Sequence, residues 1–309
     1  MATWQQRLIR EKIETVPGSP EVTAATDAVL GLDVTMRNLE ADYQDPGFLT
    51  GREGAQAEDR RNVHAGIDYQ VEAAPSGTAG VAPAFGHLLR SGGWVEAVTA
   101  DTDVTYTPAP VDTALPSCTL QMRNGALMQT VAGVRGSVGF TAEAGAKPVF
   151  SFSRRGRYAA PVAHAAETHA FAGWPRALDC VPENVFAFTL GGIALPVRSF
   201  SFTDGRAVQV NKYMGPDEIT LGPRRFTGAI ALKWPAVGTK DLLGEIHDGT
   251  IQPLIFTLGQ TAGSILTVTA PRTQIKFSGE QEIDGDLGIS LDLVFEPDSG
   301  DDEIEIRFS

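Results

Sequence analysis

The sequence predicts a mainly β protein built from antiparallel sheets, and three features predict it. Apolar and polar residues alternate over many short segments, as they do in strands with one buried and one wet face. Gly and Pro are frequent, with 33 and 19 among 309 residues, which favours many turns and disfavours long helices. Helical spacing of apolar residues is confined to a few short segments. Parallel strands need longer crossover helices between them, so antiparallel sheets are expected.

The strands are predicted from this alternation. It is clearest from Val63 to Glu72, where every second residue is apolar or small, and it recurs over 134–141 and 287–296. The predicted strands, in chain order, are Leu32–Leu39, Val63–Glu72, Val104–Tyr106, Cys118–Met122, Val134–Thr141, Phe150–Ser153, Phe186–Leu190, Arg198–Thr203, Ile230–Trp234, Leu254–Leu258, Ile265–Thr269, Thr273–Phe277, Leu287–Phe295 and Ile304–Phe308.

Two short helices are predicted, at Ala82–Arg90 and Thr239–His247. In the first, Phe85, Leu88 and Leu89 have the i, i+3, i+4 spacing of one helix face, and glycines follow. The second has the same spacing and also ends before a glycine. Each helix follows a strand that ends just before a proline, and this parallel indicates an internal repeat.

The predicted elements come in the same order in both halves of the chain. In each half a strand leads through a long polar segment, Ala41–Asn62 or Asp204–Arg225, to a strand, a proline turn, the helix, a hairpin and two more strands. We interpret this order as two copies of one β-rich unit, 1–160 and 183–309, joined by a linker at 161–182. Identities between the halves are few, so a chance correspondence between two runs of strands remains an alternative.

The charge balance excludes one class of function. Asp and Glu outnumber Lys and Arg by 38 to 25, a net charge of −13, whereas proteins that wrap nucleic acid present clustered Lys and Arg. The run of Arg154, Arg155 and Arg157 is typical of a solvated edge or a salt-bridging interface. The chain lacks the apolar segments of a signal peptide or a membrane span, so synthesis in a cytoplasm and no contact with a membrane are expected.

No catalytic or cofactor site is predicted. Phosphate-binding loops and nucleophile elbows are absent from the sequence. His164, Glu167 and His169 do not share one face of a helix or strand, so they do not form a metal site. Cys118 and Cys180 are too few for a disulfide framework or a four-cysteine zinc site. We therefore expect no enzyme, no metal and no cofactor, and a function that lies in shape or assembly.

The order of these segments resembles the major tail tube proteins of long-tailed, siphovirus-type bacteriophages. The resemblance covers nearly the whole chain and rests on order and spacing more than on any one motif. The segments that carry it are Ala28–Leu30, Ser76–Gly80, Ala82–Arg90, Val104–Pro108, Asn124–Gly125, Val134–Val138, Ala144–Ser153, Arg155–Tyr158, Gly191–Ser199 and Gly259–Ser264.

The resemblance implies two tandem β-sandwich or half-barrel units, each with one short flanking helix. It also implies a virion protein, made in the bacterial host cytoplasm, whose rings stack into a tail tube that conducts DNA. Tape-measure, terminator and distal tail proteins would be its partners, and DNA would pass without specific binding. Tube rings usually hold six single-domain subunits, so a duplicated chain predicts a trimeric ring with pseudo-sixfold symmetry; a hexameric ring is the alternative.

The two long polar segments are the expected ring-stacking loops. The candidate residues in them are Asp42, Tyr43, Asp45, Phe48, Arg52, Glu53, Lys212, Tyr213, Asp217 and Arg224. A channel lined by Asp and Glu would repel the phosphate backbone, so DNA would slide without sticking.

Two other classes of function remain open at this stage. The first is another virion β-protein, namely a tail terminator, a baseplate protein or a capsid decoration protein. The second is a carbohydrate-binding β-sandwich, although the chain has only four Trp to stack on sugars.

Overall fold

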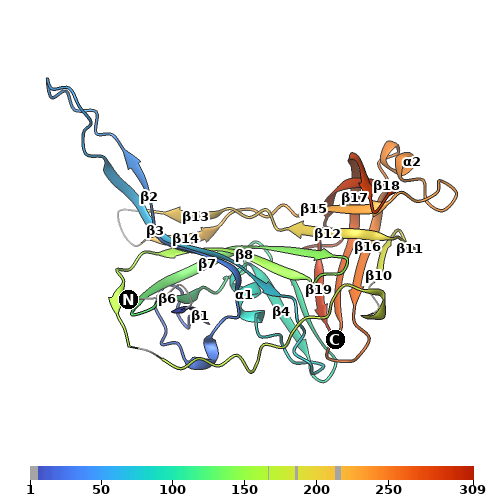
Figure 1. The fold of residues 1–309 in the computed structure, drawn as a ribbon, viewed down its shortest axis with the longest axis horizontal. Helices are drawn as coiled ribbons and strands as arrows, with labels where there is room; N and C mark the ends of the chain where they lie inside the picture. Colours follow the sequence, from blue (N-terminus) through green and yellow to red (C-terminus); the bar gives the residue numbers. More distant parts are fainter. Residues whose placement is uncertain (1–5, 166, 185–186, 213–216) are drawn as a thin grey trace.

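The computed structural model describes residues 6–165, 167–184, 187–212 and 217–309. It is mainly β, as predicted, and every pairing between its described strands is antiparallel. Most strands lie in two facing layers, which we call the wide layer and the narrow layer (Figure 1).

The wide layer combines strands from both halves of the chain. In spatial order it contains β2 (Leu32–Gln44), β3 (Asp59–Glu72), β8 (Val149–Arg157), β7 (Leu127–Glu143), β12 (Val197–Thr203), β15 (Thr227–Lys233), β18 (Asp286–Glu296) and the C-terminal part of β17 (Leu266–Ile283).

The narrow layer also draws on both halves. Its strands, in spatial order, are β4 (Trp94–Thr99), β5 (Asp103–Pro108), β19 (Glu305–Phe308), the N-terminal part of β17, β16 (Ile251–Leu258), β10 (Ala187–Leu190) and β11 (Ile193–Ala194). A further strip beside it contains β1 (Arg7–Ile13), β6 (Cys118–Asn124), the N-terminal part of β7 and β9 (Val162–Ala163).

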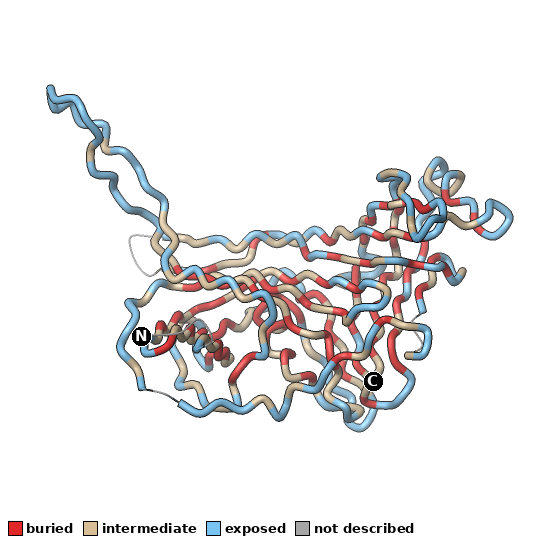
Figure 2. The backbone as a smooth tube through the Cα atoms, in the orientation of Figure 1, coloured by how far each residue is buried: buried red, intermediate tan, exposed pale blue. Residues whose placement is uncertain are grey.

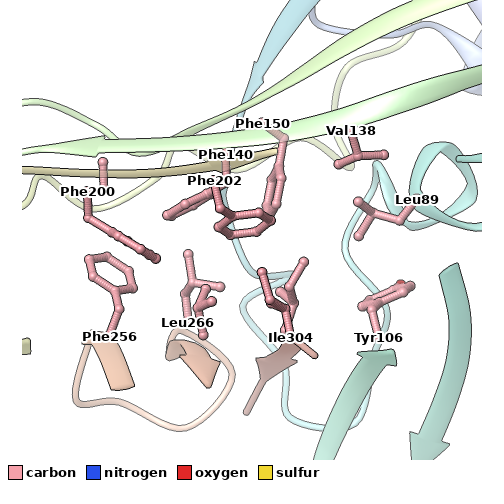
Figure 3. Close-up of a cluster of buried hydrophobic side chains, with 14 of the residues drawn as sticks. Leu89, Tyr106, Val138, Phe140, Phe150, Phe200, Phe202, Phe256, Leu266 and Ile304 are labelled. Carbon is pink, nitrogen blue, oxygen red and sulfur yellow. The ribbon is translucent and has the colours of Figure 1, made fainter. Parts of the chain in front are cut away.

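The hydrophobic core lies between the layers. Strand alternation sends Phe140, Phe150 and Phe202 from the wide layer toward Phe256 and Tyr106 of the narrow layer (Figure 3). The tube view shows the consequence, with buried and exposed positions alternating along the strands (Figure 2). Burial of large aromatic side chains removes much apolar area from water and stabilises the sandwich.

The two halves pair their strands in the same order. The first half runs β2, β3, β8, β7 across the wide layer, and the second runs β12, β15, β18, β17. In each half the last of these strands continues out of the wide layer to pair with β6 or β16. The halves join where β7 pairs with β12, so the sheet is continuous across the chain. The division into 1–160, 161–182 and 183–309 remains a prediction.

Both predicted helices are present but shorter than predicted. They are α1 (Gly86–Ser91) and α2 (Leu242–His247), with 3-10 turns at Ala25–Asp27 and Pro182–Asn184. Helix α1 begins only after Pro83 and ends at Gly92, whose N–H donates to the carbonyl oxygens of Leu88 and Leu89. The buried Leu88 and Leu89 explain the apolar spacing in the sequence.

A buried polar cluster ties α1 to the sheet. The Arg154 side chain is fully buried and donates to Glu11 Oε2 over 2.7 Å, to Ser91 Oγ over 2.7 Å and to the Leu88 carbonyl over 3.1 Å. Tyr69 donates its O–H to the other oxygen of Glu11 over 2.6 Å. Burial opposes the charge on Arg154, but the Glu11 carboxylate outweighs it and raises the pKa of the guanidinium. A Cβ at Gly136 would lie 2.6 Å from Arg154 Cδ, so this position needs glycine.

The two long polar segments contain more strand than predicted. Strands β2 and β3 continue to Gln44 and from Asp59, so Ala41–Asn62 is the outer part of a hairpin. The segment Asp204–Arg225 includes a second hairpin, β13 (Val208–Asn211) with β14 (Glu218–Leu221). Polar residues on both faces of an exposed ribbon hide the alternation on which strand prediction depends.

The predicted strands differ from the structure in three further places, two of which are strands that were not predicted. The charged segment Arg7–Ile13 forms β1, because Arg10 and Glu11 are buried and paired with Glu167 and Arg154. Trp94–Thr99 forms β4, an edge strand whose outer face is wet, which weakens its pattern. The strands predicted at 265–269 and 273–277 are one strand, β17.

Pro271 does not interrupt β17 because of where it lies. The partner on one side of β17 changes from β19 to β18 between Thr269 and Arg272, and the register with β16 shifts at the same place. The missing N–H of proline therefore breaks no ladder bond, since the ladders are interrupted there.

Candidate assembly surfaces

The outer face of the wide layer, which points away from the core, carries short polar side chains in rows across both halves. One row runs from Thr141 through Ser201 and Ala229 to Asp292 and Lys276. Others contain the residues Asp68, Ser153 and Ser137, and Gln70, Ser151, Gly139, Thr203 and Thr227. We call this surface the polar face.

The charges at one end of the polar face are paired with one another. Arg155 contacts Glu40 through Nε and Asp68 through Nη1, both at 2.9 Å. Arg37 contacts the same two carboxylates, at 2.7 Å from Asp68 and 3.0 Å from Glu40. Burial opposes ionisation of Asp68, but hydrogen bonds from Arg155 and Ser153 outweigh it and hold the pKa of that carboxyl below its usual value. The arginines of this group are thus neutralised within the chain.

The wide layer ends in two strand edges that have no partner among the described strands. Over residues 33–37, β2 pairs with β3 alone, and over 279–283, β17 pairs with β18 alone. Such edges present unpaired backbone N–H and C=O groups that favour pairing with another strand. These two edges are the two opposite sides of the wide layer.

A long arm extends from one edge. Strands β2 and β3 continue beyond the body as a two-stranded ribbon whose tip, residues 45–58, projects into solvent (Figures 1 and 2). Apolar side chains are exposed on it: Tyr43 is 59% exposed, Phe48 is 69% exposed and Leu49 is fully exposed. An exposed apolar group of this kind on a projecting ribbon marks a surface for association.

Comparison with known protein families identifies the family to which this chain belongs. The model of a family described as phage tail tube protein matches residues 4–297, nearly the whole chain. The chain belongs to the phage tail tube protein family. A comparison with curated proteins found no match. Family membership implies a structural role in the virion tail and self-assembly into a tube together with other tail proteins.

The arm of this tail tube protein contains the first group of predicted stacking residues. Asp42 accepts a hydrogen bond from Asn62 over 2.6 Å, and Asp45 accepts one from the Gly47 N–H over 2.9 Å. Both bonds shape the ribbon itself. Arg52 and Glu53 lie in the exposed tip with Phe48.

The second group is not brought together with the first. Lys212 pairs with Asp217 in the β13–β14 hairpin, and Tyr213 lies outside the described residues. Arg224 is held inside the chain by Asp301 and Glu303. The hairpin lies against the first half, where Arg135 Nη1 donates to the Ile219 carbonyl over 2.8 Å. The two proposed counterpart segments therefore differ, since one projects freely and the other is packed.

A buried carboxyl lies where the two halves join. Asp204 follows β12, is fully buried, and accepts a hydrogen bond from the Val138 N–H of β7 over 2.9 Å. Burial raises the pKa of Asp204 to about 7, although backbone N–H groups of Arg206 and Val138 act in the opposite direction.

Other kinds of site were sought in the same residues. Within the part of the chain that the structure describes, nowhere do three or more His, Cys, Asp or Glu side chains gather as a metal site would require. His164 is hydrogen-bonded to Glu167, which also pairs with Arg10. Neither α1 nor α2 has the length and apolar character of a membrane span, and the described residues contain no other candidate.

The sequence did not reveal the polar face or which strand edges remain open. The run Arg154–Arg157 was the one available signal, and its residues separate by strand alternation. Arg154 points into the core and Arg155 onto the polar face. The pairing of Arg155 with Glu40 and Asp68 joins residues far apart in the chain, so no local pattern could reveal it.

Proposed function

We propose that this tail tube protein forms rings that stack into a tube, and that its polar face lines the channel through which DNA passes. The observation that carries the proposal is the continuity of the polar face across both halves, between two open strand edges. Joining such edges around a ring would remove them from solvent and close the polar face into a wall.

The chemistry of the polar face suits a channel for DNA. Phosphate affinity comes from Lys and Arg that are free to replace counterions. Here Arg37 and Arg155 are engaged by Asp68 and Glu40, and Lys276 lies opposite Asp292. Short Ser and Thr side chains lie between them, and a shallow hollow of about 330 Å³ is lined by Asp68, Ser153 and Arg155 among others. The face carries both signs of charge, so its low affinity for phosphate would depend on paired arginines more than on the excess of acids expected from the sequence.

The arm is proposed to reach the next ring of the tube. Its exposed Tyr43, Phe48 and Leu49 would be buried there, and burial of apolar side chains stabilises association. The β13–β14 hairpin would support the wall from within its own ring.

The common strand order of the halves supports a duplicated unit and hence a ring of three chains with pseudo-sixfold symmetry. The ring of six chains remains the competing arrangement. Tape-measure, terminator and distal tail proteins are proposed as partners at the ends of the tube and within it, and the host cytoplasm as the place of synthesis.

Electron microscopy of the purified protein tests the proposal. Stacked rings are expected, with class averages that show threefold symmetry and six similar densities around the channel. Rings that never stack would instead indicate a terminator, baseplate or decoration protein. Protein that remains monomeric at high concentration, and that binds glycans saturably, would overturn the proposal.

A further inference from the structure

The internal junction between the two halves provides a template for contacts between chains. There β7 pairs with β12, with Glu143 opposite Ser199 and Gly139 opposite Thr203. Two bonds define which pairs are hydrogen-bonded: Ala144 N–H donates to the Arg198 carbonyl over 2.8 Å, and Asp204 N–H donates to the Val138 carbonyl over 3.0 Å. Alternation then makes the pair in the middle, Thr141 and Ser201, a non-hydrogen-bonded pair.

Strand register identifies the residues that occupy the same places in the other half. Phe150 of β8 lies between Val71 and Phe140, whereas Ile289 of β18 lies between Leu232 and Glu280. Glu280 therefore corresponds to Phe140, and residues 279–283 of β17 correspond to 139–143 of β7.

The same reasoning applies to the strands that begin each half. Backbone bonds from Ala73 N–H to the Pro148 carbonyl and from Trp234 N–H to the Leu287 carbonyl mark equivalent ends of β3 and β15. Counting from these ends, Met36, which lies opposite Ile67, corresponds to Phe202, which lies opposite Gly228. Residues 34–37 of β2 therefore correspond to 200–203 of β12, and the register shift between Leu32 and Thr35 ends the correspondence at Asp33.

These are the two segments whose edges are open. Strand β7 pairs with β12 at the internal junction, but among the described residues no strand pairs in this way with β17 over 279–283 or with β2 over 33–37. The open edge of β17 thus corresponds to the β7 side of the internal junction, and the open edge of β2 corresponds to the β12 side.

We propose that β17 of one chain pairs antiparallel with β2 of the next copy in the register of the internal junction. Gln281 then lies opposite Thr35, and Gly279 opposite Arg37. The inference rests on the proposed function, because it names the contact that closes the ring.

The surfaces beside these edges are complementary. A groove of about 660 Å³ lies under β2, and its lining includes Arg7, Ile9, Val34 and Met36. The corresponding space at the internal junction holds Phe140, whose ring lies 6.0 Å from that of Phe200 and 5.7 Å from that of Phe256. In the register of the proposal Glu280 and Glu282 lie on the core side of their strand, so they approach a groove that Arg7 lines.

The difference between Phe140 and Glu280 has a physical purpose in this arrangement. An apolar edge suits the internal junction, which is never exposed after folding. A charged edge keeps a free chain from pairing with unrelated strands before assembly. The contact between chains is therefore more polar than the contact within the chain.

A disulfide trap tests the register. Non-hydrogen-bonded antiparallel pairs bring their Cα atoms to about 4.5 Å, which a disulfide can span. The double variant Thr35→Cys with Gln281→Cys is assembled, oxidised mildly and analysed on non-reducing gels. Burial raises the pKa of Cys118 to about 11 and of Cys180 to about 12, so the native thiols remain protonated and covered.

Covalent trimers that revert with reductant are expected from this variant. The matched control Thr141→Cys with Ser201→Cys should close within the chain and remain monomeric on the gel. The register control Thr35→Cys with Ile283→Cys should cross-link at least tenfold less. Ladders that extend to six chains would support the pairing and contradict the ring of three.

One outcome would overturn the proposed strand pairing and another the proposed function, and the two outcomes are distinguishable. Rings seen by microscopy without cross-linking of Thr35→Cys and Gln281→Cys, or with equal cross-linking in the register control, would refute the pairing and leave the proposed function intact. Absence of any ring in the unmodified protein would refute the proposed function itself.

Discussion

Phe140 of β7 and Phe202 of β12 stack across the line where the two halves of the chain join, with ring centroids 5.3 Å apart and ring planes inclined by 25°. Their strands are directly paired at these residues. The two residues therefore contact each other both as paired strand residues and as packed core side chains, and they couple the packing of the two halves.

Phe140→Ala should destabilise the whole chain. Removal of a fully buried aromatic ring costs about 3–5 kcal/mol, because transfer energy is lost and a cavity remains. Phe277→Ala is the matched control, since Phe277 is 47% exposed at an open edge and should cost much less. Denaturant unfolding measures both variants, and equal losses would show that the junction is not a central part of the core.

Glu11→Gln should be among the most destabilising conservative changes. It leaves the fully buried Arg154 without its counter-charge, and breaking a buried ion pair in this way costs about 3–5 kcal/mol. Asp286→Asn breaks the exposed pair with Lys233 and should cost no more than about 0.5 kcal/mol. Thermal unfolding of the two variants measures the loss of stability of each. Similar losses would contradict the importance of the buried pair.

Asp204 should make stability depend on pH. Its pKa is about 7 in the folded chain and near 4 when unfolded, so the folded chain binds more protons between these values. The stabilising contribution is complete below about pH 4 and is lost as the pH rises through about 7. Relative to Asp204→Asn, the wild-type free energy of unfolding should fall across this window and be constant above it. A constant difference from pH 4 to 8 would contradict the buried-acid account.

Phe48→Ser combined with Leu49→Ser should separate ring formation from stacking. Both side chains lie on the exposed tip of the arm and contribute little to the folded monomer. The variant should unfold at the same denaturant concentration as the wild type and form rings, yet form few or no tubes in micrographs. Normal tubes from the variant would mean that the arm does not join successive rings.

Glu280→Arg should impair ring closure without unfolding the chain. A positive charge at this edge would meet the groove that Arg7 lines on the next copy, and like charges brought together in an interface disfavour association. Adding Arg7→Glu should restore rings, as judged by sedimentation velocity. Failure of the double variant to recover assembly, with both chains folded, would argue against the proposed contact.

The hydrophobic pattern determined most of the elements by itself. Alternation from Val63 to Glu72 and from Leu287 to Phe295, and the spacing of Phe85, Leu88 and Leu89, are local consequences of which side chains avoid water. These patterns were sufficient to predict an antiparallel β protein with two short helices in a repeated order, and the resemblance to tail tube proteins followed from that order.

The contacts between distant segments were decided by the tertiary structure, because no local sequence pattern contains them. Arg10 and Glu11 are buried in β1 only because Glu167 and Arg154 arrive from distant parts of the chain. Pro271 fits within β17 because the ladders are interrupted beside it. Which edges remain open, over 33–37 and 279–283, depends on the pairing of β7 with β12. Pairing between distant strands is set by the packing of the whole core, whereas alternation records only which face of each strand is buried.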